Sequence, residues 1–519
     1  MSPAIVYLVG AGPGDPGCLT LRGRDCLARA QVVIYDYLAN AELLAHAPEA
    51  AERIFAGKHG SGPKLIEQAE INALMIDRAR AGKTVVRLKG GDPMVFGRGG
   101  EEAEALAAAG VDFEVVPGVT AALAVPAFAG IPVTHRDWVS GVTVLTGHEA
   151  PGKPDTRVRW RHIATAGNTI VLLMGVTQIR ANLAALVDGG LAPETPAAAI
   201  RWGGTPRQRV VVATVGTLAV EIEALRLRPP VTVVVGEVVR LRRGLAWFER
   251  RPLFGRRVLV TRTREQASSF SSLLAEAGAA VIECPAIELA PPESLAPLDA
   301  ALERLEEYGW VIFTSVNGVE RFFARLDQLG HDIRVLHRSR LAAIGPETAR
   351  ALERRHLRPD LVPGDFRAEG LLAGLEPHNL RGVRVLLPRA AGARQILPDE
   401  LRRRGATVDE VITYRSLVPQ QGVARLRAAL EEGAIDCCTF TSSSTVGNLL
   451  RLVAEADPVH GRERLESATI ACIGPITAAA AREAGLRVAI VPAAYTIPAF
   501  AAAIIEHFTS SDRRVHADA

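Results

Sequence analysis

The sequence predicts an α/β protein of several domains, and three observations lead to this prediction. Apolar strand-like runs alternate with helical patterns, as in IVYLV at 5–9 followed by TLRGRDCLARA at 20–30. At 519 residues the chain is too long for one hydrophobic core, so two to four domains are expected. Apolar residues make up 48% of the chain and charges of both signs are nearly balanced, which is typical of a globular α/β protein.

The composition also argues against several classes of protein. A net charge of +3 without a basic stripe does not indicate a nucleic-acid partner. No apolar run reaches membrane-spanning length, and the N-terminus lacks a basic region and a cleavage site, so we expect a cytoplasmic protein with no membrane partner. The 6 cysteines lack metal-binding spacing, so we expect free thiols and no metal.

The first strand runs into the glycine turn GAGPGDPG at 10–17, and the next strand, QVVIYD, ends on Asp36. A glycine turn followed by an acid at the end of the second strand is the outline of a nucleotide-binding fold. One alternative is therefore a dinucleotide oxidoreductase that uses Gly10, Gly12 and Gly14. Two prolines in the loop are unusual for a dinucleotide-binding fingerprint. An oxidoreductase would also leave the motif at 87–102 unexplained.

The most informative stretch is RLKGGDPMVFGRGGEE at 87–102. An apolar strand stops at Gly90, Gly91 and Asp92, and after a second glycine turn a helix opens with Glu101 and Glu102. Carboxylates suit the positive end of a helix, and glycines let a ligand approach the main chain. This order of elements builds a small-molecule site at the carboxyl edge of an open sheet. The alternative is an ordinary tight loop.

The rest of the first half divides into two blocks. Thr120 and Ala121 lie in a small-residue turn that leaves room for a ligand, and a new series of strands begins near Asp137. We expect subdomains at about 1–136 and 137–243, followed by a basic linker at 244–254.

The second half contains an internal repeat. WVIFTS ending at Ser315 matches CCTFTS ending at Ser442 with an offset of 127 residues, and AAIGPETARAL from Ala342 matches ACIGPITAAAA from Ala471 with an offset of 129. A period near 130 is too long for a solenoid, so it predicts two similar α/β lobes facing a cleft. The expected lobes are 255–284 with 416–519, and 285–415.

Ordered motifs identify two families. YLVGAGPGDP, RLKGGDP-x-VFGRGGEE, VVPGVTAA, AGIPVTHR and GT-x-x-QR occur in order over 5–209. They closely resemble uroporphyrinogen-III C-methyltransferases of the tetrapyrrole methylase family, with a match over nearly all of 1–243. Residues 255–505 resemble uroporphyrinogen-III synthases through VLVTR, WVIFTSVNGV, IGP-x-TA, TYRS and FTSSS. The resemblance implies a tetrapyrrole methylase fold of two α/β subdomains, followed by a two-lobed synthase domain at 255–519.

The methylase resemblance implies S-adenosyl-L-methionine as the methyl donor. The residues that it places against this cofactor are Pro13, Gly90, Gly91, Asp92, Val95, Thr120, Ala121, Met174 and Gly204. These residue types suit the ligand, because a sulfonium favours a nearby carboxylate and adenine favours an apolar shelf such as Met174.

The resemblance also implies catalytic and substrate-binding residues. Asp36 and Lys58 align with a general base and acid, and Tyr414 with a proton donor in the synthase. The hydroxyls expected to bind substrate carboxylates are those of Thr314, Ser315, Thr441 and Ser442. The open alternatives are that Asp36 caps a helix, that Lys58 pairs with a substrate carboxylate, and that each hydroxyl is a helix N-cap.

The implied function is bifunctional. The synthase half would close hydroxymethylbilane to uroporphyrinogen III with inversion of the last ring, and the methylase half would methylate that product twice to precorrin-2, for sirohaem or cobalamin. The family implies a homodimer through the methyltransferase half. The alternative is a methylase acting on a different corrinoid, with a non-catalytic C-terminal binding module. Tyr37, His59, Leu173 and Trp202 depart from the family's usual residues, which affects how acetate and propionate arms would be held.

Overall fold

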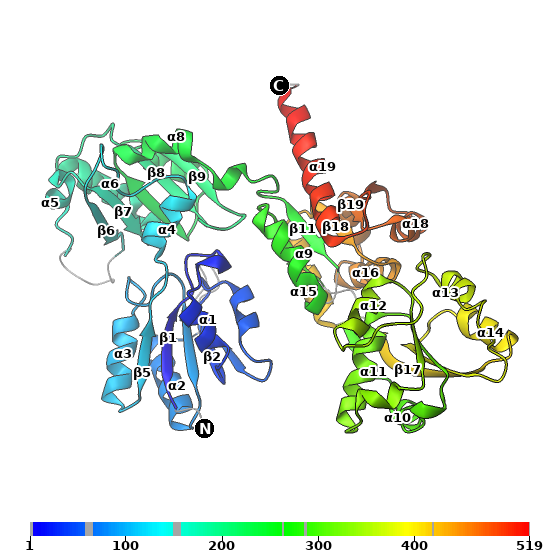
Figure 1. Cartoon of the computed structure of the whole chain (residues 1–519). Coiled ribbons are helices and arrows are strands. Elements are labelled where there is room, and N and C mark those ends of the chain that lie inside the picture. Colours follow the sequence, from blue (N-terminus) through cyan, green and yellow to red (C-terminus); the bar gives the residue numbers. More distant parts are fainter. Residues whose placement is uncertain are drawn as a thin grey trace. The chain divides into compact units, whose positions relative to one another are not determined.

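The computed structural model describes residues 4–57, 66–148, 157–261, 264–284, 288–417 and 420–517. These residues form four five-stranded sheets covered by helices, so the predicted α/β class is confirmed (Figure 1). The chain divides into two compact units. One comprises Met1–Val258, Ser271–Val281 and Ala501–Ala519, and the other comprises Leu259–Phe270 and Ile282–Phe500.

The first sheet is entirely parallel, with strand order β3-β2-β4-β1-β5. Its strands are β1 (Val6–Gly10), β2 (Val32–Tyr35), β3 (Glu52–Phe55), β4 (Val85–Lys89) and β5 (Phe113–Val116). Its helices are α1 (Leu21–Leu27), α2 (Gln68–Arg80), α3 (Gly99–Ala108) and the 3-10 turns η1 (Pro16–Cys18) and η2 (Ala41–His46).

Both faces of the first sheet are covered, because its strands are apolar on both sides. Leu8 packs in a core with Met75 of α2 and Leu106 of α3. Its neighbour Val9 points to the opposite face and packs in a core with Leu27 of α1. Burial on both faces is typical of a parallel sheet, and it leaves the carboxyl ends of the strands as the open edge.

The second sheet is mixed, with order β6-β7-β10-β8-β9, and β10 runs antiparallel to both its neighbours. Its strands are β6 (Val142–Thr146), β7 (Thr169–Leu173), β8 (Pro196–Arg201), β9 (Arg209–Thr214) and β10 (Val231–Val235). Its helices are α4 (Ala121–Phe128), α5 (Trp160–Thr165), α6 (Ile179–Asp188), α7 (Leu218–Ala224) and the 3-10 turns η3 (Val176–Gln178) and η4 (Glu237–Leu241). Helix α4 packs on one face, with Val125 against Ala198 and Val234.

The segment predicted as a linker is ordered and belongs to the first unit. It contains α8 (Arg242–Leu245) and η5 (Phe248–Arg250). Phe248 is only 1% exposed and its ring lies 5.0 Å from that of Phe128, while Arg242 forms an ion pair with Glu249 at 3.0 Å. The aromatic content of this stretch therefore makes it a packed connection, and the predicted domain boundaries stay a prediction.

The second half contains the third and fourth sheets, with orders β12-β11-β18-β19-β20 and β13-β17-β16-β14-β15. The third sheet consists of β11 (Arg257–Val260), β12 (Ala280–Glu283), β18 (Cys437–Phe440), β19 (Thr469–Cys472) and β20 (Val488–Ile490). The fourth consists of β13 (Glu288–Ala290), β14 (Trp310–Phe313), β15 (Arg340–Ala343), β16 (Arg384–Ala390) and β17 (Thr407–Leu417). The helices are α9 (Arg264–Glu276), α10 (Ala296–Leu302), α11 (Val316–Gln328), α12 (Pro346–Glu353), α13 (Ala368–Gly374), α14 (Ile396–Arg403), α15 (Gln420–Glu432), α16 (Ser443–Ala456), α17 (Gly461–Glu466), α18 (Pro475–Glu483) and α19 (Ile497–Ala517), with η6 (Leu305–Glu307) and η7 (Ile333–Leu336).

The predicted repeat appears as matching turns in these two sheets. Ser315 and Ser442 are the N-cap residues of α11 and α16. Each is separated from a buried strand by one threonine, and both have extended backbones. Gly345 and Gly474 occupy the same place before α12 and α18. The pseudo-repeat is therefore confirmed at the level of strand, turn and helix.

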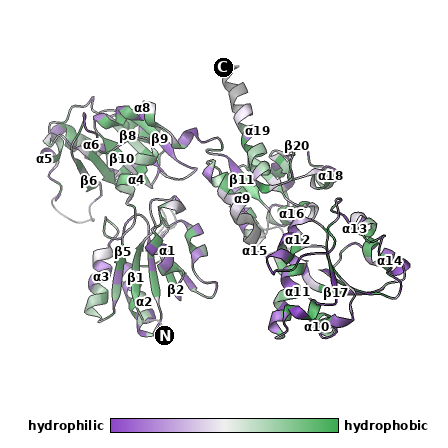
Figure 2. Ribbon diagram, in the orientation of Figure 1, coloured by the Kyte–Doolittle hydropathy of each residue, from purple (hydrophilic) through white to green (hydrophobic). Residues whose placement is uncertain are grey.

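Hydropathy follows the layers of the fold. Apolar residues concentrate along the strands and on the inner faces of the helices, and polar residues on the outer faces (Figure 2). In the part of the chain that the structure describes, no helix combines the length and apolar character needed to cross a membrane.

Candidate functional site

The loops that follow β1, β4 and β5 meet through bare main chain at the carboxyl edge of the first sheet. The Gly12 amide donates to the Gly91 carbonyl at 3.2 Å, and the Gly91 amide donates to the Gly12 carbonyl at 2.7 Å. A Cβ on Gly10 would lie 2.4 Å from the Cα of Gly118, and a Cβ on Gly118 would lie 2.3 Å from the Gly91 carbonyl oxygen. Only glycine fits at these contacts, which explains why three separate motifs each contribute one.

Asp92 ties two of these loops together. Its Oδ1 accepts a hydrogen bond from the Met94 amide at 2.8 Å, and its Oδ2 accepts one from the Gly118 amide at 2.9 Å. The carboxylate therefore fixes the turn after β4 to the turn after β5. The sequence predicts a carboxylate at this edge of the sheet. In the structure, the Asp92 carboxylate also stabilises the two loops.

The other predicted cofactor residues of the first sheet lie in well-fixed turns. Thr120 is the N-cap of α4 and its hydroxyl accepts from the Ala122 amide at 3.3 Å, next to Ala121. The loop containing Pro13 is held by Asn40, whose side-chain amide donates to the Gly14 carbonyl at 2.9 Å.

Apolar side chains are exposed at the predicted cofactor positions. Met174 follows β7 with a φ of 57° and is 52% exposed, and Val95 is 36% exposed between exposed Met94 and Phe96. Gly204 has a φ of 76°, and a Cβ there would lie 2.8 Å from the Phe128 ring. Exposed apolar groups beside fixed polar main chain are the features that an adenosine-containing ligand requires.

Asp36 lies at the same edge and is paired, so the alternative of a helix cap does not apply. Its Oδ1 accepts from Arg87 Nη2 at 2.5 Å, while the N-cap of the following η2 is Asn40. Arg87 is 2% exposed and also donates to Glu102 at 3.1 Å, and Lys89 donates to the same Glu102 oxygen at 2.7 Å. We call Asp36, Arg87, Lys89 and Glu102 the charged network.

The charged network is buried on the α2/α3 side of the sheet. Glu102 is fully buried, its Oε1 also accepts from Gln68 at 3.2 Å, and its Oε2 has no hydrogen-bond partner among the described residues. Burial, followed by the charge of Arg87, lowers the pKa of Lys89. Burial opposes the charge of Arg87 as well, but Asp36 and Glu102 outweigh it and raise its pKa. The network thus holds Asp36 in place through a cation that stays charged.

From the sequence alone, no role was predicted for Arg87 or Lys89. A signal was present, because Arg87 and Lys89 alternate within the buried strand TVVRLK and therefore point to one face. Glu102 was assigned only to the helix dipole. Lys58, the predicted acid, and the departure at His59 lie outside the described residues.

In the second half, the structure brings Tyr414 and Ser315 together. The Tyr414 hydroxyl is 3.2 Å from Ser315 Oγ, and Tyr414 is 7% exposed. Ser315 Oγ also accepts from the Gly318 amide at 3.0 Å, so Ser315 is a helix N-cap and a neighbour of the candidate proton donor at once. Thr314 precedes it and is half-buried.

The equivalent turn in the other lobe differs in its side-chain contacts. Ser442 makes no capping hydrogen bond, and its hydroxyl lies 3.1 Å from that of Ser444; Thr441 is half-buried beside it. An exposed aromatic ring lies beside the equivalent glycine in each of the two lobes. Phe366 lies against Gly345, and Tyr495 lies against Gly474, each with ring or Cβ atoms 3.3 to 3.4 Å from a Cβ built on the glycine.

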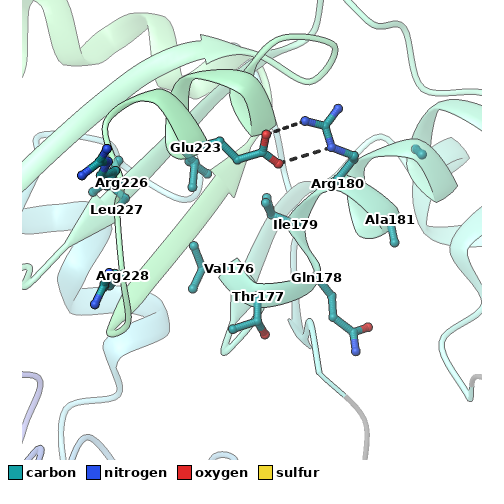
Figure 3. Close-up of a pocket in the computed structure, with 12 residues that line it drawn as sticks. Val176, Thr177, Gln178, Ile179, Arg180, Ala181, Glu223, Arg226, Leu227 and Arg228 are labelled. Atoms are coloured by element: carbon teal, nitrogen blue, oxygen red, sulfur yellow. Dashed lines mark hydrogen bonds and ion pairs between the residues drawn. The ribbon is translucent and has the colours of Figure 1, made fainter. Parts of the chain in front are cut away.

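A separate surface cavity of ≈ 750 Å³ lies between η3, α6 and the end of α7 (Figure 3). An Arg180–Glu223 ion pair crosses it at 2.6 Å, and Arg226 and Arg228 lie at its far end. None of the predicted cofactor residues lines it. Among the described residues, no group of three or more histidine, cysteine or acidic side chains is arranged to hold a metal ion.

Two family models match the chain. Residues 5–219 match the Tetrapyrrole (Corrin/Porphyrin) Methylases, and residues 268–502 match Uroporphyrinogen-III synthase HemD.

Some similar proteins match nearly the whole chain, and others match about half of it. Porphyrin biosynthesis protein HemD of Ruminiclostridium josui is 37% identical over 487 residues, which is 94% of this chain and 95% of the relative. S-adenosyl-L-methionine-dependent uroporphyrinogen III methyltransferase of Methanosarcina barkeri is 50% identical over 236 residues, 46% of this chain and 92% of the relative. Among solved structures, uroporphyrin-III C-methyl transferase from Thermus thermophilus complexed with S-adenyl homocysteine is 42% identical, covers 46% of this chain and 99% of its own, and gives a TM-score of 0.40.

Proposed function

The chain belongs to the tetrapyrrole methylases in its first half and to the HemD uroporphyrinogen-III synthases in its second, and from that premise we propose how it acts. It is a bifunctional enzyme of tetrapyrrole biosynthesis. The synthase half closes hydroxymethylbilane to uroporphyrinogen III, and the methyltransferase half methylates that product twice with S-adenosyl-L-methionine to give precorrin-2.

The observation that carries the methyltransferase assignment is the convergence of the glycine loops, Asp92 and Asp36 at one sheet edge. The residues there fit S-adenosyl-L-methionine. The main chain of three loops packs closely where Gly10, Gly91 and Gly118 touch, which fixes the turns at this edge, and Met174 and Val95 supply exposed apolar surface. When bound, this cofactor supplies an electrophilic methyl group.

The chain's own residues have separate tasks in methyl transfer. We propose that Gly90, Gly91, Thr120, Ala121 and Gly204 contact the cofactor, with Pro13 at the first loop, and that Asp92 holds the loops and adds a nearby negative charge. Methylation of a pyrrole carbon leaves a cationic ring until a proton is lost, and Asp36 accepts that proton. Arg87 fixes the orientation of the Asp36 carboxylate. Lys58 is proposed as the acid from the family alone.

The synthase half uses Tyr414 as proton donor to the departing hydroxyl of hydroxymethylbilane. Its neighbour Ser315, at 3.2 Å, orients the phenol, and Thr314, Thr441 and Ser442 bind substrate carboxylates. The substrate generates its own electrophile when water leaves, so positioning and hydrogen bonds suffice without a nucleophile.

One assay tests the proposed function. The whole protein is incubated with hydroxymethylbilane, with and without S-adenosyl-L-methionine, and the products are separated and weighed. We expect uroporphyrinogen III alone, and a product heavier by two methyl groups with the cofactor. Only the symmetrical isomer from spontaneous closure would refute the synthase assignment. Methylation of a corrinoid in place of uroporphyrinogen III would support the alternative methylase.

Several finer points belong to the same proposal. The domains are 1–243 and 255–519, the precorrin-2 product serves sirohaem or cobalamin, and the enzyme works in the cytoplasm as a homodimer through its methyltransferase half. No metal takes part in either reaction. Light scattering on the full chain tests the dimer, and retention of both activities after dialysis against a chelator tests the metal.

A further inference from the structure

Two arginines face each other across the β8–β9 hairpin. Arg201, the last residue of β8, is the register partner of Arg209, the first residue of β9. Directly opposed residues of an antiparallel pair point to the same side of the sheet, and like charges there destabilise the pairing. This position therefore costs folding free energy in the free protein.

Two further arginines extend the group. The guanidinium carbon of Arg207 lies 4.3 Å from the centre of the Trp202 ring, in the turn that joins β8 to β9. Arg228 precedes β10, whose residue Val231 is the register partner of Arg201. We call Arg201, Arg207, Arg209 and Arg228 the arginine cluster.

The protein does not neutralise the arginine cluster. None of the four guanidinium groups forms an ion pair with a carboxylate in the part of the chain that the structure describes, and the Nε of Arg201 is buried without any hydrogen-bond partner there. Burial, followed by the charges of Arg209 and Arg207 and more weakly of Arg228, lowers the pKa of Arg201. Other arginines among the described residues do pair with a carboxylate, as Arg180 does with Glu223. A buried guanidinium donor without a hydrogen-bond partner, next to three other cations, favours the binding of an anion.

The cluster lies beside the candidate active site. The Trp202 ring is 6.0 Å from the ring of Tyr37, which directly follows the candidate base Asp36. The same turn carries Gly204, a candidate cofactor residue. An anion held by the cluster would therefore lie next to both the proton acceptor and the cofactor positions.

We propose that the arginine cluster binds the carboxylate arms of the tetrapyrrole and so orients its pyrrole rings toward Asp36. This inference rests on the proposed function and adds the residues that recognise the substrate's arms. Arg201 and Arg209, on one side of the hairpin, each present a planar fork that matches a carboxylate, and two arms held there fix the macrocycle against rotation. Arg207, stacked on Trp202, and Arg228 receive further arms.

The test is direct binding of uroporphyrin, the oxidised and unreactive analogue with all eight carboxylate arms, followed by fluorescence in the full-length protein. Each charge-assisted hydrogen bond is strong enough that Arg201→Gln and Arg209→Gln should each raise Kd about tenfold or more. The wild-type Kd should rise steeply with salt, and the double variant should show a weaker salt dependence. For a macrocycle with methyl groups in place of the acetate arms, the difference in Kd between the variants and wild type should be smaller.

The matched control is Arg243→Gln, which removes the same charge from an exposed residue of α8. It should leave Kd within about twofold of wild type, since an isolated surface charge contributes little. Because Arg201→Gln removes repulsion, its Tm in the absence of ligand should equal or exceed that of wild type, so loss of binding is separable from loss of folding. Arg209→Lys, which keeps the charge and loses the fork, should bind with intermediate affinity.

Unchanged uroporphyrin affinity in the Arg201→Gln, Arg209→Gln double variant would overturn the inference. Failure of the proposed function looks different: the wild type would then bind S-adenosylhomocysteine without methylating uroporphyrinogen III. Arginine-dependent uroporphyrin binding in such a protein would still support the cluster as a polycarboxylate site. In an active enzyme, the cluster variants should raise KM for uroporphyrinogen III and leave the affinity for S-adenosylhomocysteine unchanged.

Discussion

Replacing Glu102 with glutamine tests the charged network that holds Asp36. Glu102 is fully buried, and one of its oxygens accepts from Lys89 at 2.7 Å, from Arg87 at 3.1 Å and from Gln68 at 3.2 Å. Glu102→Gln keeps the shape of the side chain but removes its charge. Two buried cations are then left with the single carboxylate of Asp36.

The size of the effect follows from this imbalance. Breaking a buried ion pair by removing one partner costs about 3–5 kcal/mol, because the remaining charge stays buried without compensation. That corresponds to an increase of about two to four powers of ten in the equilibrium constant for opening the strand. The neighbouring Glu101 offers a matched control on the same helix. Its side chain is 56% exposed and pairs with exposed Arg98, so Glu101→Gln should cost about 0–1 kcal/mol.

Lys89 gives this prediction a pH dependence. Burial already holds the pKa of Lys89 below its ordinary value, so between the two values the unfolded chain binds more protons and stability rises with pH. Loss of the Glu102 charge should lower that pKa further. The stability deficit of Glu102→Gln should therefore be largest near neutral pH and shrink as Lys89 loses its proton in alkaline solution.

Hydrogen exchange measured by mass spectrometry on the full chain is the assay, because it reports each strand separately in a protein of several domains. Peptides covering β4 (Val85–Lys89) should exchange faster in Glu102→Gln, while peptides covering β16 (Arg384–Ala390) serve as an internal control. Equal exchange of β4 in the Glu102→Gln and Glu101→Gln variants would refute the idea that the buried charges depend on one another.

Three further predictions concern the two active sites. Asp36→Asn should lower methyl transfer about a hundredfold or more, while calorimetry shows unchanged S-adenosylhomocysteine binding. The control is Asp25→Asn, which changes an exposed carboxylate. Full activity of Asp36→Asn would exclude Asp36 as the base. Gly118→Ala places a Cβ 2.3 Å from the Gly91 carbonyl oxygen, so it should lower the free energy of unfolding by about 1–3 kcal/mol and abolish S-adenosylhomocysteine binding. The control is Gly100→Ala, whose Cβ meets nothing within 4 Å, and this variant should bind normally. Equal affinities of the two variants would contradict the loop contacts. Tyr414→Phe should slow ring closure by about two powers of ten without affecting methyl transfer. The control Tyr308→Phe loses a hydrogen bond to Asp409 and should lower stability only. Normal synthase activity in Tyr414→Phe would exclude the phenol as proton donor.

Much of the fold was predictable because the strands are strongly apolar and their turns carry glycine. The two sheets of the first half and the repeated lobes of the second follow from alternation and from two offsets in the sequence. The basic composition of the segment at 244–254, with its glycine and proline, predicts a linker. Phe248 and the Arg242–Glu249 pair make it part of a packed unit, and such contacts depend on distant residues that a local pattern does not contain.

The site was predicted in its parts but not in its connections. Gly10, Gly91 and Gly118 come from three separate motifs, and their contact depends on strand order. Asp92 was expected to face the ligand, but its bonds to the Met94 and Gly118 amides depend on two loops meeting. The opposition of Arg201 and Arg209 likewise depends on the hairpin register, which the sequence alone did not fix.

A crystal structure of the full chain with S-adenosylhomocysteine tests the central claim most directly. The nucleoside should lie at the carboxyl edge of the first sheet, against the Gly90–Asp92 turn and the Thr120–Ala121 turn, with its base near Met174 and Gly204. A well-ordered ligand bound anywhere else, such as the cavity beside Arg180, would contradict the assignment of this edge as the methyl-transfer site.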